Sequence, residues 1–126
     1  FKSAADKGQE IPQVTCFEKQ DEIGGLWTYT WHDGLDKNGN PCQGSMYSNL
    51  WANNPKECLE FADYTFDDHY GKVIPSFPPR EVVVDYVKGC ATNANVLGWV
   101  KLTTMVCTTC FDEKTQLFTV VSRNLQ

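Results

Sequence analysis

The stretch IGGLWTYTW, residues 23–31, decides our prediction of the fold. Gly25 permits a tight turn into a strand, and from there successive side chains point to opposite faces. The two faces carry Trp27, Tyr29 and Trp31 on one side and Leu26, Thr28 and Thr30 on the other. The pattern fits any half-buried strand with an aromatic face, and it also fits the first strand of a barrel that a tryptophan closes at one end.

The length and the cysteine content indicate one domain, residues 1–126, in an oxidising compartment. A chain of 126 residues is the size of a single domain. Its six cysteines form an even set, which in a small domain favours disulfides. They are Cys16, Cys42, Cys58, Cys90, Cys107 and Cys110. The chain begins at Phe1 rather than Met, which fits a secreted protein that has lost its signal peptide.

The charge and the hydropathy exclude two classes of partner. The net charge of −5 argues against nucleic acid or an anionic membrane surface. No apolar run approaches the length that crosses a bilayer, so we expect no membrane insertion.

Short segments of alternating or β-branched residues recur along the chain. The expected strands are 25–32, 43–49, 58–66, 81–88, 96–107 and 116–123. No segment shows a convincing helical period with caps. The sequence therefore predicts an all-β fold, an antiparallel up-and-down β-barrel stabilised by disulfides, with a long loop at 32–55 over one mouth.

Several motifs, taken in order, resemble the lipocalins of the calycin group, particularly the invertebrate crustacyanin-like branch. The motifs are the Gly-x-Trp of Gly25 to Trp27, the run from Cys58 to Phe66-Asp67, the Val-rich run ending in Asp85-Tyr86, the segment ending in Cys107 and Cys110, and the closing Ser122-Arg123. The resemblance covers about residues 16–125. It describes an abbreviated barrel, because the interval between Asp67 and Val82 is short and the Thr-Asp-Tyr motif of the family is absent near Trp99.

The resemblance implies two structural contacts. Arg123 would pack across the indole of Trp27 at the closed end of the barrel, as a cation–π contact. Cys16 would pair with Cys110, while the pairing of the other four cysteines stays open.

The resemblance also implies a cavity that is wide enough for one small apolar ligand. The candidate ligand-binding residues are Tyr29, Trp31, Tyr64, Phe66, Val84, Tyr86, Trp99 and Phe118. The alternative is that these side chains fill a solid core.

No arrangement of residues predicts catalysis or metal binding. Cys107 and Cys110 lack the second pair of ligands that a zinc site needs, and His32 and His69 fall in turns without metal-ligand spacing. No Ser, His and Asp occur in a catalytic pattern. We therefore expect no enzyme, no metal and no required cofactor.

These observations lead to a secreted, lipocalin-like protein that carries a small hydrophobic ligand. A carotenoid or similar pigment is the favoured ligand, and a retinoid, bile pigment, fatty acid or pheromone are the others. A shortened barrel would also let the ligand lie between two subunits of a homo- or hetero-oligomer. The alternative is a secreted, disulfide-rich interaction protein, an inhibitor or toxin-like module, that acts through its surface loops without a ligand.

Overall fold

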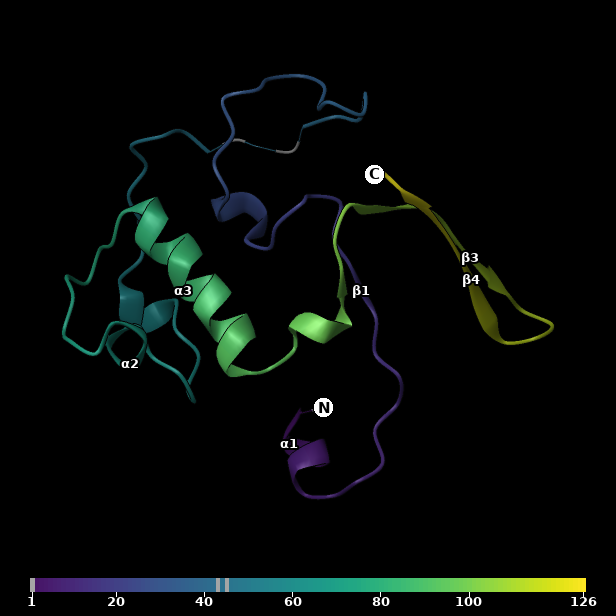
Figure 1. Ribbon diagram of the computed structural model, residues 1–126, viewed down its shortest axis with the longest axis horizontal. Helices are drawn as coiled ribbons and strands as arrows, with labels where there is room; N and C mark the ends of the chain where they lie inside the picture. Colours follow the sequence, from purple (N-terminus) through teal and green to yellow (C-terminus); the bar gives the residue numbers. More distant parts are fainter. Residues whose placement is uncertain (1, 43, 45) are drawn as a thin grey trace. The chain divides into compact units, whose positions relative to one another are not determined.

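The computed structural model describes residues 2–42, 44 and 46–126. Their contacts group into two compact units, one formed by residues 1–22 with 94–126 and the other by residues 23–93. Both units mix short helices with turns, and the strands belong to the first (Figure 1).

The first unit holds two small sheets. Its elements are α1 (Lys2–Asp6), β1 (Cys16–Phe17), the 3-10 helix η3 (Leu97–Trp99), β2 (Val100–Lys101), β3 (Thr104–Asp112) and β4 (Leu117–Asn124). Strands β1 and β2 pair in parallel, with Cys16 opposite Val100. Strands β3 and β4 form an antiparallel hairpin (Figure 1), whose register shifts between Val106 and Thr108.

The hairpin forms where β-branched residues flank a polar turn. Asp112 closes that turn, since its carbonyl accepts from the amide of Gln116 at 2.8 Å and its carboxylate accepts from the amide of Lys114 at 2.8 Å. Gln116 takes the left-handed conformation, with φ 58°. The rings of Phe111 and Phe118 meet across the strands, with centroids 4.8 Å apart.

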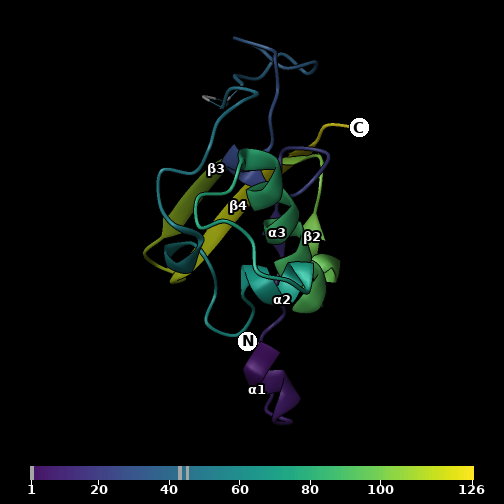
Figure 2. The same ribbon diagram turned by 90° about the vertical axis from the view of Figure 1, so that its left-hand side faces the viewer.

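The second unit is helical. Its elements are the 3-10 helices η1 (Gly25–Trp27) and η2 (Lys56–Cys58), and the α-helices α2 (Phe66–Tyr70) and α3 (Arg80–Asn93). Helix α2 lies against α3 (Figure 2). The buried hydrophobic residues that the structure describes are Ala52, Phe66, Val83 and Tyr86, all within this unit.

Local sequence explains both helices. Pro79 stands just before α3 and its carbonyl accepts from the amides of Val82 and Val83, so the proline occupies a place where its missing N–H costs nothing. Helix α2 begins with a capping box between Thr65 and Asp68. It ends at Gly71, which is left-handed with φ 63°.

The core of the second unit is an aromatic stack. The rings of Phe66 and Tyr86 lie 3.8 Å apart between centroids, and neither residue is more than 1% exposed. The hydroxyl of Tyr86 donates to the carbonyl of Tyr64 at 2.5 Å and accepts from the amide of Phe61 at 2.8 Å. Burial raises the pKa of Tyr86 to about 12, so this phenol stays a donor over the ordinary pH range.

An ion pair between a buried lysine and a partly exposed aspartate joins three segments of this unit. Lys56 is 4% exposed and its ammonium binds the carboxylate of Asp67 on α2. The same carboxylate oxygen accepts from the amide of Ile74 at 3.3 Å. The hydrogen bond from Lys56 is the main reason that the pKa of Asp67 lies below its ordinary value.

The predicted β-barrel is wrong. The described residues hold two two-stranded sheets and no closed barrel. The predicted strand at 81–88 lies within helix α3, and the predicted strands at 25–32 and 58–66 give way to η1, η2 and the start of α2. A closed sheet needs long strands with continuous pairing, whereas β1 and β2 have two residues each.

Two predicted strands meet other outcomes. The strand expected at 116–123 is confirmed as β4, and the one at 96–107 divides into η3, β2 and the start of β3. The strand expected at 43–49 includes residues 43 and 45, which lie outside the described residues.

The predicted disulfides are also wrong, because all six cysteines are free thiols. Five of the cysteines lie on elements of the two units: Cys16 on β1, Cys107 and Cys110 on β3, Cys58 in η2 and Cys90 on α3. Burial is the main reason that the pKa of Cys90 is raised. In the part of the chain that the structure describes, no helix combines the length and the apolar composition that a bilayer crossing requires.

The backbone at Gly24 gives a first prediction. Gly24 has φ 139°, and a Cβ there would lie 2.4 Å from Oγ1 of Thr28 and 2.8 Å from a methyl of Val84. We expect Gly24→Ala to lower the free energy of unfolding by about 2 kcal/mol, measured by urea denaturation. Gly98→Ala is the control, because a Cβ there meets nothing within 4 Å. Equal stability of the two variants would contradict the close packing at Gly24.

The ion pair gives a second prediction, on pH. Because the pKa of Asp67 is lowered in the fold, the pair stabilises the protein above the unfolded pKa, and this stability is lost as the pH falls through the folded pKa. Lys56→Met removes the main cause, so the pKa of Asp67, measured by NMR titration of its carboxyl, should rise toward 3.8. The exposed Lys72→Met is the matched control and should leave it unchanged. An Asp67 pKa that Lys56→Met does not move would refute the assignment.

Candidate functional site

The segment just after β1, residues 18–20, is hydrogen-bonded to β2, to the start of β3 and to the turn between them. Glu18 donates its amide to the carbonyl of Lys101 at 3.0 Å, and its own carbonyl accepts from Thr104 at 2.8 Å. The carbonyl of Gln20 accepts from the amide of Thr103 at 2.8 Å. Residues 18–20 therefore have a defined backbone at the carboxyl end of a strand in a parallel pair.

The side chains of this segment offer hydrogen-bond acceptors. Oε1 of the half-buried Glu18 accepts from the amide of Gln20 at 2.8 Å. The side-chain oxygen of Gln20 is buried and has no hydrogen-bond partner among the described residues. A buried acceptor without a donor costs about 1–3 kcal/mol, so a ligand that brings a hydroxyl or N–H group would be favoured here.

Such an edge suits a nucleotide. In doubly wound folds, ligands bind beyond the carboxyl ends of parallel strands, and an acidic side chain there binds a ribose hydroxyl. Glu18 supplies the acid, and Gln20 supplies a second acceptor two residues further on. The glycine fingerprint that binds the pyrophosphate in these folds does not occur in residues 1–126. The residues present therefore fit the ribose part of a dinucleotide.

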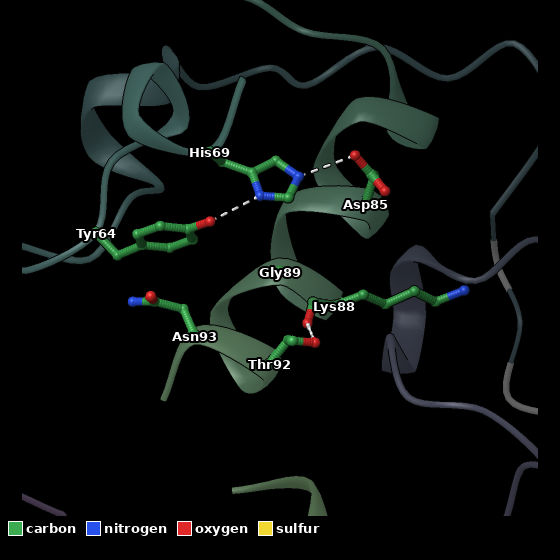
Figure 3. A pocket seen from close by; sticks show the side chains of 7 residues that line it. All are labelled: Tyr64, His69, Asp85, Lys88, Gly89, Thr92 and Asn93. Atoms are coloured by element: carbon green, nitrogen blue, oxygen red, sulfur yellow. Dashed lines mark hydrogen bonds and ion pairs between the residues drawn. The ribbon is translucent and has the colours of Figure 1, made fainter. Parts of the chain in front are cut away.

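A second feature is an open pocket in the helical unit. It has a volume of about 550 Å³ and lies between the 64–69 segment and one side of α3 (Figure 3). The residues that line it are Tyr64, His69, Asp85, Lys88, Gly89, Thr92 and Asn93.

His69 is held at both ring nitrogens. Nδ1 lies 3.0 Å from the hydroxyl of Tyr64 and Nε2 lies 2.9 Å from Oδ2 of Asp85 (Figure 3). Oδ2 of Asp85 also accepts from the hydroxyl of Tyr70 at 2.8 Å. Tyr64, His69, Tyr70 and Asp85 therefore form one hydrogen-bonded network, which joins the 60–66 segment and α2 to α3.

The carboxylate of Asp85 is the charged group that His69 and Tyr70 share in this network. The hydrogen bond from His69, followed by that from Tyr70, lowers the pKa of Asp85. Burial, followed by the hydrogen bond to Asp85, raises the pKa of Tyr70. Asp85 is thus ionised and Tyr70 protonated over the ordinary pH range.

The candidate ligand-binding residues fall in different places. Tyr64, Phe66 and Tyr86 pack together in the helical unit, and Tyr29 lies under the guanidinium of Arg80, 4.9 Å from its ring centroid. The others are Val84, half-buried on α3; Trp31, 73% exposed; Trp99, half-buried in η3; and Phe118, 70% exposed on β4. Three of the eight therefore form part of a packed core.

The residues expected to close the barrel have other roles. Gly25 begins η1 with φ 54°, and Trp27 packs against the core of the helical unit. Arg123 lies on β4 opposite Met105. The cation–π contact between Trp27 and Arg123 was inferred as the floor of a barrel, and without a closed sheet that inference has no basis.

Sequence reasoning missed Glu18, Gln20 and the partners of His69. The run Val14 to Phe17 followed by Glu18 is a short apolar segment that ends in an acid, which is a signal for a strand of a nucleotide-binding fold. The lipocalin resemblance instead implies that Cys16 belongs to a disulfide, which leaves this signal without a role. The sequence predicts a turn at His69 and a strand at 81–88, whereas helix α3 brings Asp85 to His69.

Comparison with known proteins identifies the family. The family model described as flavin-binding monooxygenase-like matches residues 1–121. The chain is 53% identical to trimethylamine monooxygenase of Methylocella silvestris over 126 residues, which is 100% of this chain and 28% of that protein. It is similar to the crystal structure of Tmm from Pelagibacter sp. strain HTCC7211, with a TM-score of 0.84 and 43% identity over 98% of this chain and 30% of that one.

A more distant structure shares the fold. The S-allyl-L-cysteine S-oxygenase of Allium sativum matches with a TM-score of 0.69 and 23% identity, over 96% of this chain and 30% of that one. The chain spans 28% of the length of the trimethylamine monooxygenases of Methylocella silvestris and Roseovarius nubinhibens, and so less than a third of these relatives.

These matches overturn the lipocalin resemblance and what it implied. A carrier of a carotenoid or other hydrophobic ligand, and the alternative of an inhibitor or toxin-like module, are both wrong, because the relatives are flavin-type monooxygenases. The expectations of a non-enzyme, of no required cofactor and of a hydrophobic ligand as partner fail on the same finding. The prediction of secretion is wrong as well: it rested on the lipocalin family, on disulfides and on the start at Phe1, whereas the relatives are monooxygenases and the cysteines are free. The match over residues 1–121 and the identity along the whole chain show that this chain belongs to the flavin-binding monooxygenase-like family.

Proposed function

We propose that this chain is part of a flavin-dependent monooxygenase that oxygenates a small tertiary amine. The observation that carries the proposal is the 53% identity to a trimethylamine monooxygenase over all 126 residues. A second relative with the same name, from Roseovarius nubinhibens, is 52% identical over 124 residues. The TM-score of 0.84 with Tmm supports the same assignment, because the fold is retained along with the sequence.

The proposed reaction transfers one oxygen atom to nitrogen. A tertiary amine, O₂, NADPH and a proton give the amine N-oxide, water and NADP⁺. The nicotinamide supplies two electrons as hydride, one oxygen atom forms the N–O bond, and the other leaves as water. The flavin, when bound, supplies the redox chemistry with O₂.

Within this chain, Glu18 and Gln20 would bind the ribose of the flavin dinucleotide. The carboxylate of Glu18 accepts from a ribose hydroxyl, and its orientation is fixed by the amide of Gln20. The buried side-chain oxygen of Gln20 gains the donor that it lacks among the described residues. Both side chains then orient the cofactor and take no part in the oxygen transfer.

A chimera tests the reaction. Residues 1–126 replace the aligned segment of the Methylocella silvestris enzyme, which supplies the rest of the protein. We expect the chimera to retain flavin and to convert trimethylamine to its N-oxide with consumption of NADPH, measured by product analysis. A chimera that retains flavin without oxygenating any tertiary amine would refute the substrate class. A folded chimera that binds no flavin would refute the function.

A variant tests the role of Glu18. In the chimera, Glu18→Gln should raise the dissociation constant of the flavin about tenfold, because a charged acceptor for the ribose hydroxyl becomes neutral. The constant is measured by fluorescence titration of the apoprotein. Glu10→Gln, at an exposed position ahead of β1, is the control and should leave the constant unchanged. Equal affinity of the two variants would exclude Glu18 from the ribose site.

A further inference from the structure

We propose that Tyr64, His69, Asp85 and Tyr70 form an acid-sensitive latch that holds the carboxyl-terminal half of α2 against α3. The latch is separate from the proposed nucleotide edge, which belongs to the other unit. It controls one wall of the open pocket, because His69 and Asp85 both line that pocket (Figure 3).

The geometry links three segments through one carboxylate. His69 and Tyr70 come from the end of α2, and both bind Oδ2 of Asp85 on α3, at 2.9 and 2.8 Å. The hydroxyl of Tyr70 also lies 3.1 Å from the carbonyl of Val82 on α3. The other nitrogen of His69 binds Tyr64, which precedes α2. Removing the charge of Asp85 weakens both contacts of α2 together.

Gly89 leaves the space for the imidazole. A Cβ at Gly89 would lie 2.3 Å from two atoms of the His69 ring. Gly in the middle of a helix is less stable than Ala by about 1 kcal/mol, and α3 carries it one turn after Asp85. The absence of a side chain at Gly89 lets the ring approach α3 closely enough for Nε2 to reach the carboxylate of Asp85.

Helix α2 depends on such contacts. It has five residues, and helices of that length are not stable alone in water. Phe66 anchors its first turn in the core and the ring of Tyr70 packs against that core, whereas the polar groups of His69 and Tyr70 are held by the latch. Opening the latch would therefore loosen the end of α2, residues 69–71, and leave in place both the core stack and the bond from the amide of Ile74 to Asp67.

Protons from solvent can reach the latch. The side chain of Asp85 is 59% exposed, while that of His69 is 16% exposed. The groups that face Asp85 are His69 and Tyr70 from α2 and Lys88 from α3. These contacts lower the pKa of Asp85 from its ordinary value. The latch is therefore closed at every pH at which Asp85 is ionised, and it opens as the pH falls through the pKa that Asp85 has in the folded protein.

Hydrogen exchange in the protein that contains this sequence tests the latch. Asp85→Asn imitates the protonated carboxyl at neutral pH, and the amides of residues 69–71 should exchange about fivefold faster. The amide of Val83 in α3 should keep its rate. Asp67 and Asp68 also titrate in α2, so the difference between the pH profiles of the wild type and Asp85→Asn isolates Asp85.

A steric variant separates the latch from helix propensity. Gly89→Ala keeps every charged group but displaces the imidazole, and we expect the same faster exchange at residues 69–71 although alanine favours the helix. Asp112→Asn, in the hairpin of the other unit, is the control and should change nothing at α2. Unchanged exchange in Asp85→Asn, or slower exchange in Gly89→Ala, would overturn the proposal.

Discussion

The stack of Phe66 on Tyr86 is the contact on which the helical unit depends. The two rings have 0% and 1% exposure, and burying such side chains stabilises a fold by about 1.5–3 kcal/mol each. The hydroxyl of Tyr86 is bonded on both sides, to Phe61 and Tyr64. The stack therefore fixes both the approach of α2 to α3 and the path of the segment between residues 61 and 66. The polar chain through His69 lies at the edge of this stack, and its geometry follows from it.

The first unit is organised by backbone pairing instead. Its large apolar side chains on the hairpin are exposed, among them Phe118 at 70% and Leu117 at 66%. What is ordered there is the ladder of β3 and β4 and the fixed segment 18–20 beside β2. This arrangement places at the end of a strand the acid of Glu18 and the amide oxygen of Gln20, which has no hydrogen-bond partner among the residues that the structure describes. The two units thus differ in what orders them, a packed aromatic core in one and backbone pairing in the other, and the proposed ligand-binding edge lies in the latter.

Sequence reasoning located the strand at 116–123 because two signals agree there, alternation and a polar turn just before it. It failed at α3 because the run of Val82, Val83 and Val84 favours a strand by propensity, whereas tertiary packing decides in favour of the helix. The spacing of Val83, Tyr86 and Cys90 carries the helical period, and the paired prolines at 78 and 79 mark the start of the helix. These signals were present but weaker than the β-branched run.

The family was mistaken because short motifs in the right order are weak evidence when each can arise in another fold. Gly25-Leu26-Trp27 begins a 3-10 helix rather than a barrel strand, and the six cysteines are free. The position of Glu18 could have been found from the strand that precedes it, but the unpaired oxygen of Gln20 and the contacts of His69 depend on segments distant in sequence. Only the folded chain brings those groups together.

The most direct measurement is the identity of the small molecule bound to the purified protein that contains this sequence. Denaturation of the protein releases any bound cofactor, and the released compound is identified by its visible absorption and its mass. Our account predicts that this compound is a flavin dinucleotide. After the protein is reconstituted with that flavin, it should hold one flavin per protein molecule. A folded protein that binds no flavin under these conditions, or that releases a carotenoid instead, would contradict it.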